Sequence, residues 1–244
     1  MPRFFVAASN IFGGIAYLGA EDAGHFRALR ISRGECITVC DGAGNDYTCR
    51  VTDVTGDGAE AEIVSVEPSV SEPTVKCTVY AALSTGEKLD TVVQKSVELG
   101  ASEIVVFPSD RCVAKPDGAA LIKRLQRLNK IALSAAEQSE RGIIPQVLPA
   151  PSFPAAMSSA AGAELPLFCY EEERTVGLRA ALDARPDAKT VSIVTGPEGG
   201  FTPEEAQLAR DCGLISVSLG PRILRCETAP LAALSAVMLL SGNL

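Results

Sequence analysis

The sequence predicts an α/β protein whose sheet is largely parallel, preceded by a small β-rich domain. From residue 74 onward, short apolar runs alternate with segments of helical period. This alternation is typical of a parallel sheet covered by helices on both faces. Before residue 70, three β-type runs recur about every ten residues between Gly- and Asp-containing turns, a spacing typical of a small barrel or sandwich.

The β-rich part contains strand candidates at residues 36–40, 47–52 and 61–66. Clusters of Gly and Asp separate them, and such residues favour turns. The segment Ser69-Val-Ser-Glu-Pro73 has the composition of a linker. We therefore expect a first domain over residues 1–70 and a second over residues 73–244.

The second domain shows a regular order of expected elements. Amphipathic helices are expected to end at glycines such as Gly100, because glycine readily adopts the conformation that follows a helix. Strands are expected at residues 75–83, 103–107, 165–170, 191–195 and 215–219. Helices are expected at residues 87–99, 119–138, 176–184, 203–212 and 229–240.

Composition excludes several protein classes. The 244 residues are 47% hydrophobic, which allows a sizeable core, yet no apolar run reaches the roughly 18 residues of a membrane span. The N-terminus does not resemble a signal peptide, so we expect a cytoplasmic protein without a membrane partner. The eight cysteines form no Cys-x-x-Cys pair and His25 is the only histidine. We therefore expect free thiols and no metal site.

Charge is distributed unevenly along the chain. The net charge of −8 argues against a protein coated for nucleic acid. However, residues 35–72 hold nine acids and one base, a local balance of −8 that equals the total. Residues 111–141 hold seven bases and three acids, a balance of +4. The acidity therefore belongs to one segment, and the basic segments leave RNA binding open, although a solvated helix face is the commoner explanation of such a stripe.

Two loops follow the ends of expected strands, where α/β sheets bind ligands. The first is Gly196-Pro-Glu-Gly-Gly200, which precedes Thr202-Pro-Glu-Glu205. Thr202 with Glu205 forms the pattern of a capping box, so a helix begins there. The second is Gly220-Pro-Arg-Ile-Leu-Arg-Cys-Glu-Thr228. Its apolar side chains could hold an adenine, and its charged groups could act on a substrate.

Common nucleotide fingerprints do not fit these loops. A dinucleotide site needs Gly-x-Gly-x-x-Gly after the first strand, and a phosphate loop needs Gly-Lys followed by Ser or Thr. The glycines at 196, 199 and 200 have another spacing and lie far from the first strand. Two tight structural turns without a ligand remain an alternative at this point.

The loop residues resemble the signature of the RsmE family, the 16S ribosomal RNA (uracil-N3) methyltransferases of the SPOUT superfamily. The resemblance rests on Gly196-Pro-Glu-Gly-Gly-Phe201, Leu219-Gly-Pro-Arg-Ile-Leu-Arg225 and Glu227-Thr-Ala229. Three further stretches agree, from near the N-terminus to the middle of the chain: Arg3-Phe-Phe5 with His25 and Leu29-Arg30, residues 83–100 with Lys88 and Lys95, and Ala136-Glu-Gln-Ser-Glu-Arg141 with Pro145.

The resemblance implies a fold and a ligand that spacing alone does not give. Residues 1–70 would form an RNA-binding PUA-like β-barrel, and residues 73–244 a SPOUT domain with a C-terminal trefoil knot. The protein would be a homodimer that acts on 16S rRNA of the small ribosomal subunit. Residues 167–170 could complete the pocket for S-adenosyl-L-methionine. Its implied ligands are Thr195, Gly196, Glu198, Gly199, Leu219, Gly220, Ile223, Leu224, Arg225, Thr228 and Ala229.

Removal of the proton from N3 of uracil requires a base or a cation that stabilises the anion. Arg225 is the candidate cation, and Glu198 and Glu227 are candidate bases or orienting groups. Glu227 could instead compensate a helix dipole, and Glu198 could be a plain turn residue. The candidate RNA contacts are Arg3, Arg27, Arg30, Gln138 and Arg141. For the last two, a contact with the partner subunit or a plain exposed helix end is also open.

The chain departs from the family pattern at Pro2, Phe26 and Cys226, and residues 11–14 are poor in charge. These departures concern the RNA side more than the methyl-donor side. Two other functions therefore remain open: a SPOUT methyltransferase acting on another RNA such as tRNA, and a non-catalytic RNA-binding protein with the same fold.

Overall fold

The computed structural model describes residues 1–244, and the chain divides into two compact units. The first unit consists of Met1–Glu72 together with Ala136–Ile144. The second consists of Pro73–Ala135 together with Pro145–Leu244. The segment at 136–144, expected in the second domain, thus belongs to the first unit.

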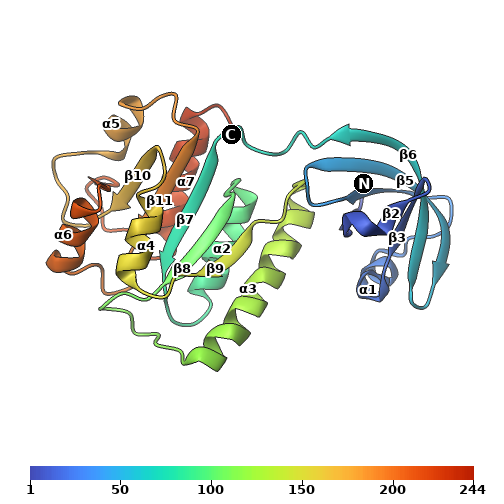
Figure 1. The fold of residues 1–244 in the computed structure, drawn as a ribbon, viewed down its shortest axis with the longest axis horizontal. Coiled ribbons are helices and arrows are strands. Elements are labelled where there is room, and N and C mark those ends of the chain that lie inside the picture. Colours follow the sequence, from blue (N-terminus) through green and yellow to red (C-terminus); the bar gives the residue numbers. More distant parts are fainter. The chain divides into compact units, whose positions relative to one another are not determined.

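The first unit contains a six-stranded sheet, the α-helix α1 and a single 3-10 turn (Figure 1). Its strands follow the order β1-β4-β5-β6-β3-β2, and only the pairing of β1 with β4 is parallel. The strands are β1 (Arg3–Phe5), β2 (Ile11–Phe12), β3 (Ile15–Leu18), β4 (Cys36–Cys40), β5 (Asn45–Thr55) and β6 (Gly58–Pro68). The helices are the single turn η1 (Ala8–Asn10) and α1 (Ala20–Leu29).

Alternation along the strands creates the core of this unit. In β3, Ala16 and Leu18 are buried while Ile15 and Tyr17 are only partly buried, because successive side chains of a strand point to opposite faces. Phe26 of α1 packs against the buried face, with its ring 4.7 Å from that of Phe4. The helix therefore covers one face of the sheet.

The second unit is a six-stranded parallel sheet in the order β12-β10-β11-β7-β8-β9. Its strands are β7 (Lys76–Ala82), β8 (Glu103–Phe107), β9 (Gln146–Pro149), β10 (Leu165–Cys169), β11 (Thr190–Thr195) and β12 (Ile215–Val217). Its helices are α2 (Lys88–Glu98), α3 (Gly118–Gln138), α4 (Phe153–Ala160), α5 (Leu178–Asp183), α6 (Pro203–Asp211) and α7 (Thr228–Leu240). The predicted α/β class is confirmed.

Helices cover both faces of this sheet. Helix α7 packs against α2 and α5 and contacts β7 and β11. Helix α4 contacts the same two strands and also packs against α6 (Figure 1). The central strands β10 and β11 are buried nearly throughout, as expected for strands enclosed between two helical layers.

Seven elements were not predicted: strands β1, β2, β3 and β9, the turn η1, and helices α1 and α4. Helix α1 has a weak apolar period, and strand β9 has four residues and ends at a proline. Helix α4 lies in an Ala-rich stretch that was left without structure, although Ser152 caps it and Pro154 lies in its first turn. No helix of the chain is both long enough and apolar enough to cross a membrane.

Candidate functional site

The two glycine-containing loops meet in one pocket at the carboxyl ends of β10, β11 and β12. The cavity has a volume of about 470 Å³, a size typical of small-molecule sites. The loop after β11 supplies residues 195–200, and the segment after β12 supplies most of residues 218–229. Tyr170 and Glu171 extend from the end of β10, and Lys88 reaches the cavity from the start of α2.

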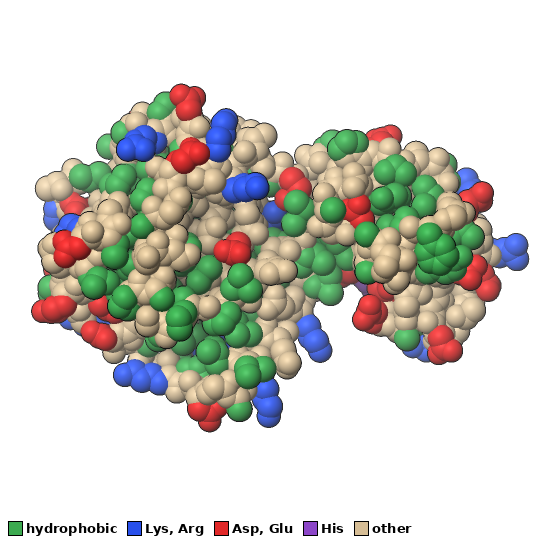
Figure 2. All heavy atoms as spheres, viewed as in Figure 1, with side chains coloured by type: hydrophobic (Ala, Val, Ile, Leu, Met, Phe, Trp, Pro, Cys, Tyr) green, Lys and Arg blue, Asp and Glu red, His purple; other side chains and the backbone are tan.

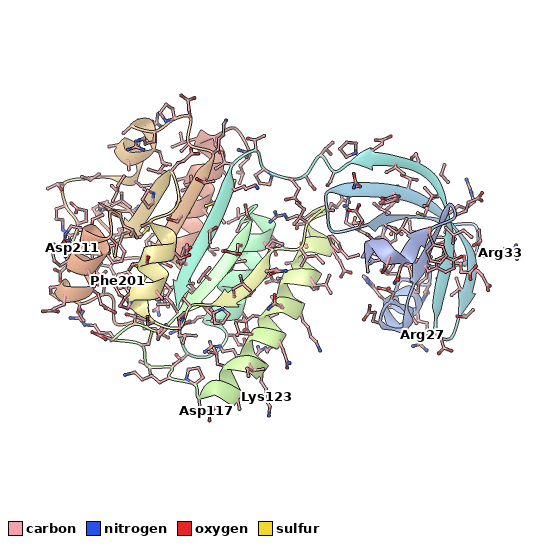
Figure 3. All side chains as sticks on the ribbon, viewed as in Figure 1. Arg27, Arg33, Asp117, Lys123, Phe201 and Asp211 are labelled. Carbon is pink, nitrogen blue, oxygen red and sulfur yellow. The ribbon has the colours of Figure 1, made fainter.

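The first loop is anchored at both ends by buried side chains. Thr195 is 1% exposed, and its hydroxyl donates a hydrogen bond to the Tyr80 carbonyl in the neighbouring strand. Phe201 is 1% exposed and lies beside α4 and α6 (Figure 3), with its ring 4.4 Å from that of Phe168. A side chain at Gly196 would meet the Phe201 ring at 3.1 Å. Position 196 therefore has little room for any residue larger than glycine.

Gly200 and Glu171 fix the end of the first loop. Gly200 has a φ of +68°, which favours glycine, and a Cβ there would lie 1.8 Å from Glu171 Oε1. The same oxygen accepts a hydrogen bond from the Phe201 backbone N–H at 3.1 Å. Position 200 thus requires glycine for its conformation and for the approach of this carboxylate.

The loop between β8 and α3 holds the first loop from another side. Arg111 donates from Nη1 to the carbonyls of Gly199 and Phe201, at 3.2 and 3.1 Å. Glu205, in the capping box of α6, accepts from the Asp110 backbone N–H. Two segments far apart in sequence are therefore joined directly beside the pocket.

Glu198 is held by a group of donors from the start of α2. Its Oε1 accepts from the backbone N–H and hydroxyl of Thr85 and from Lys88 Nζ, each within 2.9 Å. Burial acts to raise the pKa of this carboxyl, but the Thr85 N–H and the Lys88 ammonium outweigh it and lower the pKa to about 2. Glu198 is therefore ionised at neutral pH and is a weak base.

The second loop is more open than the first. Gly220 has a φ of +107°, and nothing lies near the position of an added Cβ. Ile223 is 72% exposed, and Arg225 is exposed as well. The hydrogen bonds of residues 219–227 stay within the loop and its junctions with β12 and α7. The loop thus presents apolar and cationic side chains without fixing them.

Glu227 begins α7 at the rim of the pocket. It occupies the N-cap position without a side-chain cap bond. A hydrogen bond to its own backbone N–H lowers its pKa, and the Cys226 thiol, Lys88 and Arg225 act in the same direction. The side chain thus stays charged next to the helix N-terminus, so the dipole alternative and a role in the pocket are compatible.

Most candidate cofactor residues line the pocket. These are Thr195, Gly196, Glu198, Gly199, Leu219, Gly220, Ile223, Leu224, Arg225 and Ala229, whereas Thr228 does not line it. No role was predicted for Glu171, and Lys88 was named only as part of the family resemblance, yet both line the pocket. Glu171 is the second residue after the end of β10, where ligand sites of α/β sheets concentrate, so it could have been predicted.

The candidate RNA contacts separate into two groups. Arg3 pairs with Asp46 through both Nη atoms at 2.8 Å, and its side chain is 10% exposed. Arg141 pairs with Glu72 at 2.6 Å, and its side chain is 4% exposed. Both guanidinium groups are engaged inside the first unit. A contact of Arg3 with phosphate, and of Arg141 with RNA or the partner subunit, stays a prediction.

Three of the candidate RNA contacts are exposed: Arg27, Arg30 and Gln138. Arg27 and Arg33 lie on the outside of the first unit (Figure 3). Arg30 has a φ of 57° directly after α1. Nothing in their packing prevents a contact with RNA.

Comparison with known families identifies both parts of the chain. The RNA methyltransferase domain family matches residues 71–238. The RNA methyltransferase PUA domain family matches residues 18–64. The first match contains both pocket loops, and the second covers most of the first sheet.

Individual relatives match over nearly the whole chain. Ribosomal RNA small subunit methyltransferase E of Bacillus subtilis is 33% identical over 89% of this chain and 87% of its own length. The protein of that name from Aquifex aeolicus is 31% identical over 93% and 95%. The crystal structure of the Neisseria gonorrhoeae protein of that name, bound to S-adenosyl methionine, superimposes with a TM-score of 0.87 at 36% identity, over 98% of each chain.

Proposed function

Because the chain belongs to the ribosomal RNA small subunit methyltransferase E family, we propose that it methylates N3 of a uridine in the decoding region of 16S rRNA. The methyl donor is S-adenosyl-L-methionine. The observation that carries the proposal is the pocket formed by the first loop (residues 195–201) and the second loop (residues 218–229), with its glycine-lined wall.

The chemistry of the pocket fits this donor. Its volume of about 470 Å³ is within the range of small-molecule sites. Leu219, Ile223 and Leu224 supply apolar surface for an adenine, and the glycines expose backbone groups that bind polar atoms. The donor supplies a methyl group on a sulfonium, and transfer then requires mainly alignment of the acceptor.

Of the charged residues of the pocket, one holds the first loop in place and two are candidates for the reaction with uracil. Glu198 is engaged by Thr85 and Lys88, so its contribution is to keep the first loop in place. Arg225 is exposed on the second loop and is suited to stabilise the uracil anion that forms when N3 loses its proton. Glu227, close to Arg225, remains the candidate that orients the base or accepts the proton.

A titration of the purified protein with S-adenosylmethionine, followed by calorimetry, tests donor binding. We expect saturable binding, and absence of binding at millimolar donor would leave a non-catalytic RNA-binding protein. Mapping of methylated uridines on small-subunit RNA from a deletion strain tests the acceptor. We expect one N3-methyluridine of the decoding region to disappear. If it persisted, the substrate would be another RNA such as tRNA.

RNA binding is proposed for the domain at residues 1–70, with Arg27 and Arg30 as phosphate contacts, and Gln138 is proposed as a further RNA contact. Phosphate contacts position a nucleic acid without reading its sequence. The exposure of these side chains supports the proposal. A cytoplasmic location follows from the substrate, since that is where ribosomal subunits are assembled.

We also propose the homodimer and the trefoil knot implied by the resemblance for the domain at residues 73–244. Leu239 and Leu240 are 61% and 43% exposed near the end of α7, which supports a partner on this apolar helix. Analytical ultracentrifugation should give twice the mass of the chain. When a single molecule is pulled by its two termini, the unfolded chain should be shorter than a fully extended chain, because a tightened knot retains residues.

A further inference from the structure

A pair of stacked aromatic rings stands on the outer face of the first sheet. Phe12 of β2 and Tyr17 of β3 have ring centroids 4.6 Å apart and planes 20° apart. Phe12 is 59% exposed, and Gly13 and Gly14, both with positive φ, form the turn between the two strands. Exposed aromatic rings are typical of recognition surfaces, because they bury much area on contact.

The register of the strands places three carboxylates beside these rings. Phe12 pairs with Ile15, which pairs with Glu62, and Tyr17 pairs with Glu60, which pairs with Asp53. Residues directly opposite each other in a sheet share a face. The outer face of β2, β3, β5 and β6 is therefore an acidic aromatic face, defined by Phe12, Ile15, Tyr17, Asp53, Glu60 and Glu62.

The carboxylates of this face are largely without internal partners. Glu60 and Glu62 are exposed, and neither makes an ion pair within the chain. Arg50 lies opposite Glu62 in the sheet. However, Arg50 Nη1 donates a hydrogen bond to the Gly34 carbonyl. Figure 2 shows hydrophobic side chains with acidic ones around them where Figure 1 draws β2 and β3.

The charge of the face selects one class of partner. Three carboxylates with one arginine repel phosphates, so this face is unsuited to RNA even though its rings could stack on bases. A guanidinium or ammonium group instead gains from the ring faces and from the carboxylates together. Because β2 is at one edge of the sheet, an extended segment can lie along it.

We propose that the acidic aromatic face binds an extended, arginine-rich segment of a protein. Such segments are expected in a ribonucleoprotein substrate, because proteins that coat RNA carry many cations. The idea that the segment belongs to a ribonucleoprotein substrate rests on the proposed function. Binding of the segment itself depends only on the first unit. Part of the acidic charge of residues 35–72 would then serve to bind a cationic protein segment, although the substrate RNA is an anion.

The test is fluorescence anisotropy of the full chain with a labelled peptide of six Arg-Gly repeats. We expect Glu60→Gln/Glu62→Gln to weaken binding about five- to tenfold, as loss of two exposed charge pairs allows. Phe12→Ala should weaken it about threefold, and Phe12→Tyr should restore it. The matched control is Asp187→Asn/Glu204→Gln, which removes the same charge from exposed positions of the second unit and should leave binding unchanged.

Equal affinity of the peptide for the parent and for the face variants would overturn the proposal. The proposal would also be overturned if the chain bound dodecauridylate and Phe12→Ala weakened that binding, because the rings would then bind RNA. Methylation of protein-free RNA by the face variants should equal that of the parent. Failure of donor binding with intact peptide binding would refute the proposed function and leave this inference standing.

Discussion

The two loops of the pocket are built in opposite ways. The first loop accepts hydrogen bonds from Thr85, Lys88 and Arg111. It also donates one, from the Phe201 backbone N–H, to Glu171. The second loop makes hydrogen bonds only within itself and at its two junctions. Both follow parallel strands of one sheet, so their difference comes from the Glu198 side chain of the first loop and from the neighbouring segments that bond to this loop.

The difference indicates a division of labour. A segment with many fixed bonds keeps its geometry, whereas one with few bonds opens at lower cost. The first loop is therefore suited to hold the donor in one position. The second loop can adjust when a large RNA acceptor enters, and it carries the exposed Arg225, which we propose stabilises the uracil anion.

The largest expected effect is the loss of methylation in Arg225→Ala. Removing a cation that stabilises a developing anion typically costs about a hundredfold or more in rate. Donor affinity should change by less than about threefold, because the first loop is intact. Single-turnover methylation and donor titration measure the two quantities. Arg222→Ala removes a cation from the same loop as a control, and equal losses in both variants would contradict a specific role.

A smaller effect, on donor affinity, is expected for Gly200→Ala. Its φ of +68° costs an alanine roughly 1–2 kcal/mol, and the new Cβ would displace the Glu171 carboxylate. We expect donor affinity to fall about tenfold or more. Gly220→Ala adds a Cβ in open space on the second loop, and that loop can shift to relieve strain. If Gly220→Ala lost as much donor affinity as Gly200→Ala, the two loops would be equally rigid.

Much of the fold could be predicted from the sequence because the signals are local. The strand end at Thr195 and the capping box at Thr202 and Glu205 were predicted where the structure has them, whereas β12 ends two residues before the predicted end at residue 219. Helix α4 was not predicted, although the cap at Ser152 and the proline at 154 in its first turn are local signals. Strand β9 is too short to carry a period, and its place at the sheet edge depends on pairing with β8.

The site could be predicted only in part, for a physical reason. The groups that hold the first loop are distant in the sequence. Glu171, which binds the Phe201 N–H, is 30 positions away, and Thr85, which binds Glu198, is 113 positions away. Charge counting likewise could not show that Arg3 and Arg141 are paired with Asp46 and Glu72. Such pairs form only after the chain folds. Composition therefore gives the number of charges but does not show which of them are exposed to a ligand.

The smallest expected effect is a pH-dependent change in stability for Glu198→Gln. The folded-state pKa of about 2 is below the usual 4.5 of a glutamate, so the ionised carboxylate stabilises the folded chain. That contribution is complete above about pH 4.5 and is lost as the pH falls toward 2. The parent should therefore have the higher melting temperature at neutral pH, and the difference should vanish in acid. Glu172→Gln, which lies outside the first loop, should show no such convergence. A difference for Glu198→Gln that persisted unchanged down to pH 2 would mean that packing, and not charge, holds the first loop.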